Sequence, residues 1–226
     1  MNGPAVTVII PVHNGERFLG EAIASALDQR YQPVEVIVVD DASTDASHHI
    51  AASFAAVTAI RLPVQKGPAA ARNAGLAVAT GKYVAFLDAD DVMSPDRLAV
   101  QIAHLGSHPH VGAVLVSQEI DVEPGVEPPG WLLANPQHLD EGGYLPISVL
   151  VATDLLRKLG GFDPSYLMSE DMELLFRLHK AGVVVEKLDD VLVRRRIHGA
   201  NLTYNARPME RDLLRAVRAI LTNGRS

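Results

Sequence analysis

The sequence contains no cysteine, few aromatic residues and no long apolar run. Without cysteine, the chain cannot form disulfides, thiolate metal sites or a cysteine nucleophile, and the absence fits a reducing compartment. No stretch approaches the roughly 20 apolar residues that a membrane-spanning helix needs. The N-terminus also lacks the basic-then-apolar pattern of a secretory signal. These absences predict a soluble, cytoplasmic protein without a transmembrane segment.

Basic charge is also scarce. The chain carries 27 acidic and 20 basic residues, for a net charge of −7. A nucleic-acid surface normally needs a basic stripe, so we expect no nucleic-acid partner. The one basic run, Arg194–Arg195–Arg196, is short, and we expect it to alternate across a solvent-exposed strand.

Two common phosphate-binding motifs are missing. The chain has no G-x-x-x-x-G-K-[ST] sequence, and no G-x-G-x-x-G follows its first apolar segment. We therefore expect this chain to be neither a P-loop enzyme nor a nicotinamide dehydrogenase. If this protein binds phosphate, a cation must neutralise it, with Lys66 or Arg72 as possible helpers.

What the sequence does have is a regular alternation of strands and helices. At 226 residues with 48% hydrophobic content, it suits one domain with a sizeable core. Short β-branched runs predict buried strands, and amphipathic or alanine-rich segments between them predict helices. This order indicates an α/β fold with a mainly parallel sheet flanked by helices. The predicted strands are Val6–Val12, Val34–Val39, Ala59–Leu62 and Tyr83–Leu87, and the helices are Phe18–Leu27, one starting at Ser43 or Thr44, Pro68–Ala79, and one capped by Ser94 with Pro95 at its first position.

The second half is less regular. After a strand at Val111–Val116, the segment Glu119–Glu141 is rich in proline and glycine and predicts a long loop that is functional or disordered. The elements expected beyond it are a strand at Pro146–Val151, a helix at Thr153–Leu159, a helix capped by Ser169 and ending near Ala181, one or two strands in Val183–Ile197, and a terminal amphipathic helix at Pro208–Leu221.

Acidic residues gather where two predicted strands end, at Asp40–Asp41 and at Asp88–Ala89–Asp90–Asp91. Helix capping could explain single acids there. It explains three carboxylates within four residues poorly, because they repel one another unless a cation or solvent screens them. Residues two apart on a strand face the same side, so Asp88 and Asp90 are expected to converge on one ligand. Oxygen donors without thiolate favour Mn²⁺ or Mg²⁺, and Mg²⁺ is commonly shared with substrate phosphates.

Several short segments, taken in order, resemble the family 2 inverting glycosyltransferases of the GT-A fold. The similarity runs from about Val6 to His198, and the ordered set is far more specific than any one segment. The segments are Val8–Asn14, Val38–Asp45, Ala71–Gly75, Phe86–Asp91, and Gly160–Asp163 followed by Ser169–Glu170–Asp171.

The resemblance implies a donor site and a cation. Pro11 and His13 would border the nucleobase, Asp41 would accept a hydrogen bond from it, and Arg72 would approach the base or the phosphates. Asp88 would hold the ribose or the cation, with Ala89 beside it, and Asp90 would bind the Mn²⁺ or Mg²⁺ that bridges the diphosphate; His198 is a candidate further metal contact. The family commonly has an aromatic residue where His13 stands. UDP is the expected carrier, with GDP and dTDP as alternatives.

The resemblance also implies that Asp171 is the general base. An inverting transfer needs a base that takes the proton of the acceptor hydroxyl as this oxygen attacks the anomeric carbon. Asp171 and Glu170 are expected in the first turn of a helix, where the dipole keeps a carboxylate ionised. Without the resemblance, both would pass as ordinary first-turn acids. Glu170 is expected to orient Asp171 or to bind acceptor hydroxyls.

The prediction is therefore one GT-A-like domain over residues 1–226. Residues 1–110 would bind the nucleotide, residues 111–207 would supply the base and the acceptor surface, and residues 208–226 would form a C-terminal helix. The expected partners are a nucleoside-diphosphate sugar and an acceptor with a free hydroxyl, which could be a saccharide, a lipid-linked compound or another molecule. Two alternatives remain open: a non-catalytic protein of the same fold that binds a nucleotide sugar, and a sugar nucleotidyltransferase.

Overall fold

The computed structural model describes residues 5–134, 146–166 and 169–201. The predicted helix at Pro208–Leu221 lies outside these residues. In chain order, the elements are β1 (Val6–Val12), α1 (Leu19–Leu27), β2 (Val34–Asp40), α2 (Ser47–Ser53), β3 (Val57–Arg61), α3 (Pro68–Val78), β4 (Tyr83–Phe86), β5 (Val92–Met93), α4 (Arg97–Ser107), β6 (Val111–Val122), α5 (Gly130–Ala134), the 3-10 turn η2 (Pro146–Ser148), β7 (Leu150–Ala152), α6 (Thr153–Lys158), α7 (Glu170–Lys180) and β8 (Val184–Ile197).

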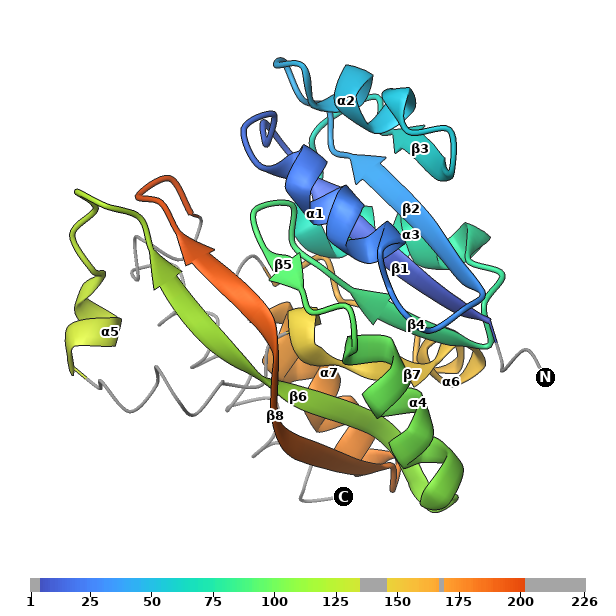
Figure 1. The fold of residues 1–226 in the computed structure, drawn as a ribbon. Helices are drawn as coiled ribbons and strands as arrows, with labels where there is room; N and C mark the ends of the chain where they lie inside the picture. Colours follow the sequence, from blue (N-terminus) through green and yellow to red (C-terminus); the bar gives the residue numbers. More distant parts are fainter. Residues whose placement is uncertain (1–4, 135–145, 167–168, 202–226) are drawn as a thin grey trace.

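One mixed sheet forms the centre of the molecule, with strand order β3-β2-β1-β4-β7-β6-β8-β5 (Figure 1). β1 to β4 run parallel, as the alternation of strands and helices predicts. The short β7 is antiparallel to both β4 and β6, whereas β6 and β8 are parallel. The α/β class is confirmed, and the sheet is mainly parallel with antiparallel pairs in its second half.

The two faces of the sheet carry separate cores. Along β1, Val8 and Ile10 point to a face covered by α1 and α4, whereas Ile9 points to the face covered by α3, α6 and α7. All three side chains are fully buried. A strand with apolar residues on both sides needs helices on both sides, so the unbroken apolar runs in the sequence match this three-layer arrangement.

The predicted boundaries fail most clearly in the second half. β6 does not stop at Val116 but runs to Val122, inside the segment predicted as a loop. It continues because Ser117–Val122 pairs with Val191–Ile197 of β8, and the two strands run side by side to their ends (Figure 1). β8 is one strand of 14 residues. The predicted strand at Pro146–Val151 is instead a 3-10 turn followed by the three-residue β7.

Two predicted helix starts are also wrong. α2 begins at Ser47 instead of Ser43 or Thr44, because the side chains before it bond to a neighbouring loop. α4 begins at Arg97, and the residue before it, Asp96, makes no side-chain cap. Within the part of the chain that the structure describes, no helix has both the length and the apolar character needed to cross a bilayer.

Candidate active site

Three parallel strands bring the predicted donor residues to one edge of the sheet. His13 directly follows β1, Asp41 follows β2, and Asp88 lies two residues beyond β4. Pro11 is buried on β1 opposite Val39 of β2. Ligands of open α/β sheets bind at this carboxyl edge.

The loops after β1 and β2 are held together by hydrogen bonds. Asn14 donates its backbone N–H to Ser43 Oγ at 2.9 Å, and its own Oδ1 accepts the backbone N–H of Thr44 at 2.8 Å. Glu16 and Asp45 form a second reciprocal pair: Glu16 N–H bonds Asp45 Oδ2 at 3.0 Å, and Glu16 Oε2 accepts Ala46 N–H at 2.9 Å. This pairing moves the start of α2 to Ser47 and gives the rim of the site a defined shape.

Asp41 is buried between these loops and the turn before α3. Its two carboxylate oxygens accept the backbone N–H groups of Lys66 at 2.8 Å and Gly67 at 2.7 Å. Its carbonyl oxygen lies 2.7 Å from Nδ1 of His13, so the base-site candidates on β1 and β2 are in direct contact. Each carboxylate oxygen has two lone pairs, so Asp41 can still accept a hydrogen bond from a ligand.

The carboxylates of Asp88, Asp90 and Asp91 converge. One oxygen from each lies within 4.8 Å of the others. The convergence of Asp88 and Asp90 was predicted for the wrong reason, because β4 ends at Phe86 and the acids lie on a turn in which Asp91 N–H bonds Asp88 O at 3.1 Å. The turn also brings in Asp91, which the predicted metal-ligand set omitted.

This carboxylate cluster is suited to a hard divalent cation. Asp91 is buried, and its burial together with the charges of Asp90 and Asp88 raises its pKa well above the usual range. A bound cation would offset this repulsion, and three carboxylate oxygens are the donors that Mn²⁺ and Mg²⁺ accept. The residues therefore fit the predicted cation.

His198 reaches the same cluster from the end of β8. Its Nε2 lies 3.0 Å from Asp90 Oδ2, and the Asn201 side chain donates to the same oxygen at 2.8 Å. The His198 ring packs against Phe18 with centroids 4.7 Å apart. The structure thus brings the predicted metal residues Asp88, Asp90 and His198 into one neighbourhood.

Ala89 lies at the point where this turn meets the loop after β1. A Cβ atom added to Gly15 would lie 3.5 Å from the Ala89 Cβ and only 2.8 Å from Val12 Cγ2. A side chain at position 15 would therefore clash with Val12 of β1, while its Cβ would only touch Ala89 at an ordinary contact distance.

Arg72 links the cluster to α7. Its guanidinium is buried and donates to Asp88 Oδ1 at 2.7 Å and to Glu170 Oε1 at 2.6 Å. Burial lowers the pKa of Arg72, but the attraction of Asp88 and Glu170 outweighs burial and raises it. The buried Nε has no hydrogen-bond partner among the described residues. Glu170 was expected to orient Asp171 or to bind acceptor; its described partner is Arg72.

Asp171 lies beside Glu170 at the start of α7. Burial of its carboxyl and the negative charge of Glu170 raise the pKa of Asp171 to about 7, against the lowering effect of the Met172 N–H bond and the charge of Arg72. The bond from Met172 N–H to Asp171 Oδ1 is 2.7 Å. The expectation that the helix dipole keeps this carboxylate ionised is therefore wrong, because burial and the charge of Glu170 outweigh the groups that favour the ionised form.

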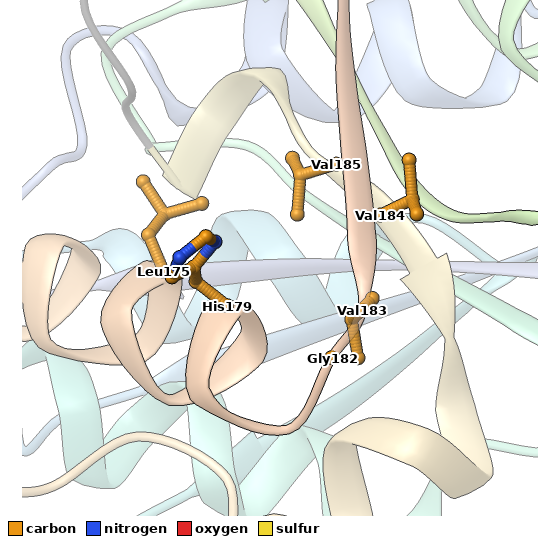
Figure 2. Close-up of a pocket in the computed structure, with 6 residues that line it drawn as sticks. All are labelled: Leu175, His179, Gly182, Val183, Val184 and Val185. Carbon is orange, nitrogen blue, oxygen red and sulfur yellow. The ribbon is translucent and has the colours of Figure 1, made fainter.

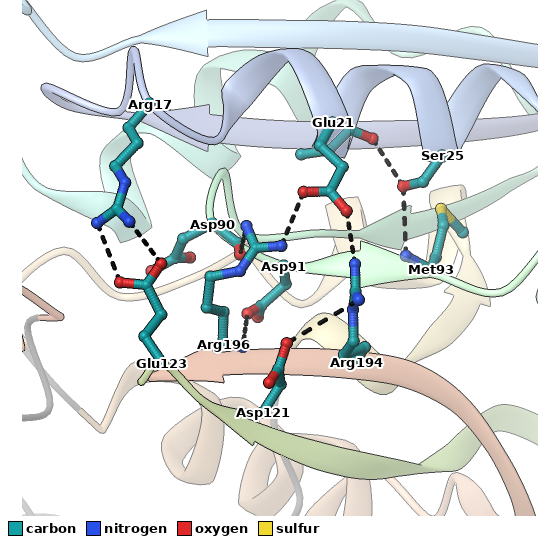
Figure 3. Close-up of polar contacts among 11 residues, drawn as sticks. Arg17, Glu21, Ser25, Asp90, Asp91, Met93, Asp121, Glu123, Arg194 and Arg196 are labelled. Atoms are coloured by element: carbon teal, nitrogen blue, oxygen red, sulfur yellow. Dashed lines mark hydrogen bonds and ion pairs between the residues drawn. The ribbon is translucent and has the colours of Figure 1, made fainter. Parts of the chain in front are cut away.

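The basic run on β8 is not a solvated surface. Arg196 is buried, and both Arg194 and Arg196 point towards Glu21 of α1 (Figure 3). The expectation of an exposed run is wrong because β8 pairs with both β6 and β5, which brings its side chains against α1 and the aspartate turn. The adjacency of three arginines in the sequence did not indicate which of them faces inward.

A separate cavity of about 540 Å³ lies where α7 turns into β8 (Figure 2). Its lining is mostly apolar and includes Leu175, His179 and Val183 to Val185. None of the predicted site residues lines it. The predicted site residues therefore lie apart from this cavity.

Comparisons with known proteins identify the family of this chain. The model of the family described as glycosyl transferase family 2 matches residues 7–155. The putative glycosyltransferase EpsE of Bacillus subtilis is 34% identical over 209 residues, which cover 85% of this chain and 73% of EpsE. The chain spans between 42% and 73% of the lengths of the first three curated relatives.

Two solved structures share the fold. S. aureus TarS 1-349, in complex with UDP-GlcNAc, has a TM-score of 0.73 at 23% identity. The match covers 87% of this chain and 59% of the TarS chain. The mannosyltransferase PcManGT from Pyrobaculum calidifontis, in complex with GDP-Man and Mn²⁺, has a TM-score of 0.73 at 26% identity. The match covers 96% of this chain and 64% of the PcManGT chain. These likenesses confirm the GT-A-like architecture.

Proposed function

This chain belongs to glycosyl transferase family 2, and from that premise we propose that it is an inverting, metal-assisted transferase that moves a sugar from a UDP-sugar to an acceptor hydroxyl. One observation carries the proposal. Of the three convergent carboxylates after β4, that of Asp88 bonds Arg72, and Arg72 also bonds Glu170, the chain neighbour of Asp171. The carboxyl of Asp171 has a pKa of about 7. The residues proposed to hold the cation and the proposed proton acceptor are therefore linked through one buried arginine and one peptide bond.

The donor would bind across the loops after β1, β2 and β4. Pro11, His13 and Asp41 would border the nucleobase, and Asp88 with Ala89 would lie along the ribose and diphosphate. The contact between His13 and Asp41 supports this assignment, because a single planar group could meet both. The two fold neighbours are bound to UDP-GlcNAc and to GDP-Man. We propose UDP as the nucleotide of the donor, because the ordered set of sequence segments resembles family 2 enzymes, for which UDP is the expected carrier.

Asp88, Asp90, Asp91 and His198 would hold the Mn²⁺ or Mg²⁺. When bound, the ion supplies positive charge for the leaving diphosphate. Asp88 would have two partners, Arg72 and the cation. One of its carboxylate oxygens bonds Arg72, and the side chain is 39% exposed, so a ligand can still reach it. Arg72 keeps Asp88 turned towards the cluster while its second bond holds Glu170.

Asp171 would act as the general base. Its carboxylate takes the proton of the acceptor hydroxyl while the hydroxyl oxygen forms a bond to the anomeric carbon and the bond to the diphosphate breaks. This single displacement inverts the anomeric centre and leaves no covalent sugar–enzyme intermediate. A pKa of about 7 suits the task, because a base is most efficient when its pKa lies near the working pH.

The acceptor side would come from residues 111–207, with residues 1–110 as the nucleotide half. Asp171 on α7 belongs to the second half and the aspartate turn to the first, so the reacting groups would meet between them. The acceptor is a compound with a free hydroxyl, such as a saccharide or a lipid-linked sugar.

The test is Asp171→Asn. With UDP-sugars and a panel of saccharide and lipid-linked acceptors, we expect UDP release to fall about 10²–10⁴-fold, the range typical for loss of a general base. Binding of UDP should persist. Asp154→Asn is the matched control, because Asp154 is an exposed acid in the first turn of α6. Turnover at the wild-type rate in Asp171→Asn would rule out this base, and pyrophosphate release from UTP and a sugar phosphate would identify a nucleotidyltransferase instead.

A further inference from the structure

Arg196 contacts the aspartate turn in two ways (Figure 3). Its backbone N–H donates to Asp91 Oδ1 at 2.8 Å, and its guanidinium Nη1 donates to the carbonyl oxygen of Asp90 at 3.3 Å. One residue of β8 therefore holds both the carboxylate of Asp91 and the backbone of Asp90. The side chain is buried and lies over the Phe18 ring at 4.5 Å.

The other end of this guanidinium is held by Glu21. Arg196 Nη2 donates to Glu21 Oε2 at 2.7 Å, while Arg194 Nη2 donates to Glu21 Oε1 at 2.5 Å. The hydrogen bond from Arg196, supported by the charges of Arg196 and Arg194, lowers the pKa of Glu21. Glu21 is therefore ionised at neutral pH and receives one arginine on each oxygen.

We propose that Glu21 is a positioning residue for the cation site, acting through Arg196 on the turn that carries Asp90 and Asp91. The proposal rests on the proposed function, since it assumes that this turn binds a divalent cation. Glu21 itself belongs to α1 and makes no described contact with the aspartates; its effect passes through one guanidinium.

The physical reason is a competition between two positive charges. The two charges are the guanidinium of Arg196 and the bound cation. Arg196 lies next to the three convergent carboxylates that would bind the cation. While Glu21 holds Nη2, the guanidinium bonds the carbonyl of Asp90 and makes no described hydrogen bond to the carboxylate of Asp90 or Asp91. Without Glu21, the same guanidinium is free to turn towards those carboxylates, where it would displace the cation and distort the turn.

Arg194 provides the matched control. It is on the same strand and shares the same partner, but its described contacts are with Glu21 and, at 3.9 Å, with Asp121. Loss of Arg194 should remove the other ion pair of Glu21, which is more exposed than that of Arg196, without releasing Arg196. The two substitutions Glu21→Gln and Arg194→Gln therefore separate an effect on the cation site from a general weakening of the contact between α1 and β8.

The experiment is a titration of the full chain with MnCl₂ at saturating UDP, with free Mn²⁺ followed by electron paramagnetic resonance. We expect Glu21→Gln to weaken Mn²⁺ binding about tenfold, within the coupling range measured for contacting residues. Arg194→Gln should stay within about twofold of wild type. The thermal midpoint of each variant, measured alongside, reports whether any loss follows destabilisation.

A second variant tests the route through Arg196. Arg196→Met removes the guanidinium and keeps the backbone N–H that bonds Asp91. In that background, Glu21→Gln should have no further effect on Mn²⁺ affinity, because the charge it restrains is gone. An equal loss in both backgrounds, or unchanged affinity in Glu21→Gln alone, would overturn the positioning role while leaving the transferase proposal intact. If wild type binds no Mn²⁺ with UDP present, the proposed function itself fails.

Discussion

At the residue scale, Asp171 is subject to opposing influences. A helix N-terminus favours an ionised carboxylate, and the Met172 N–H bond acts in the same direction. Burial and the adjacent charge of Glu170 outweigh both and raise the pKa of Asp171 to about 7. A group in this condition is a usable base near neutral pH but disfavours the folded state once it is ionised.

This conflict predicts opposite pH dependences for rate and stability. The base must be deprotonated, so kcat/KM should rise with pH through about 7 and level off above it. The pKa of Asp171 in the folded state lies above its unfolded value near 3.8. Ionisation of Asp171 therefore lowers the free energy of unfolding. This loss of stability is absent below pH 3.8 and complete above about pH 7.

The variant Asp171→Asn should therefore be inactive yet more stable than wild type at pH 8. Tenfold changes in proton affinity are worth about 1.4 kcal/mol each, and partial exposure reduces the effect, so we expect a gain of about 1–2 kcal/mol. Urea unfolding at pH 8 and pH 3 would measure it, with almost no difference expected at pH 3, below the unfolded-state pKa near 3.8. A variant that is less stable than wild type at pH 8 would contradict this account of the carboxyl.

The acids were easier to locate from the sequence than their contacts were. Asp41, Asp88 and Asp90 follow apolar strands, a pattern that places them at the carboxyl edge. No sequence pattern pairs Arg72 with Glu170, which is 98 positions away, or shows that Arg196 lies against Asp91. Such pairs depend on how distant elements pack, and they leave no periodic signal along the chain.

At the element scale, one buried side chain fixes the start of α4 to the centre of the sheet. Arg97 is fully buried, and its guanidinium donates to the carbonyls of Phe86 at 3.1 Å and Val149 at 3.2 Å and to the Gln101 side chain at 3.2 Å. Among the described residues it has no carboxylate partner, and burial lowers the pKa of Arg97 to about 9. The carbonyl of Phe86 ends β4, two residues before Asp88, so Arg97 supports the strand that carries the aspartate turn.

We therefore expect Arg97→Ala to destabilise the fold by about 3 kcal/mol or more, because it leaves buried acceptors unsatisfied at about 1–3 kcal/mol each. Arg157→Ala is the control. Arg157 also bonds two backbone carbonyls, Leu76 and Ala79, but its side chain is 39% exposed and water can replace it. Chemical denaturation should show a cost of about 1 kcal/mol or less for the control. Equal costs would contradict a special role for Arg97.

Element types were predictable and several boundaries were not. The runs in β1, β2 and β4 are apolar on both faces, so their burial was evident from composition. The predicted strand stops at Val116 because the segment Glu119–Glu141 as a whole is rich in proline and glycine. Its first four residues, Glu119 to Val122, alternate polar and apolar side chains as a half-exposed strand does, and they pair with β8. The start of α2 moved because Asn14 and Glu16 take the hydrogen bonds of the residues predicted to cap it.

At the scale of the whole molecule, one sheet joins the two predicted halves. β4 of the first half pairs with β7 of the second, and β5 pairs with β8. The Arg72 bridge, the Arg196 contacts and the His198 contact all cross from one half to the other at the aspartate turn. A ligand bound at this turn would therefore contact both halves, as an enzyme that joins a donor to an acceptor requires.

The most direct test is a calorimetric titration of UDP into the chain with MnCl₂ and, separately, with EDTA, for wild type, Asp90→Asn and the control Asp154→Asn. We expect Mn²⁺ to tighten UDP binding at least about tenfold in wild type and in Asp154→Asn, since a carboxylate-bound cation is shared with substrate phosphates. Asp90→Asn should lose most of this gain. UDP affinity that is the same in EDTA and in Mn²⁺ would contradict a cation held between the aspartate turn and the diphosphate.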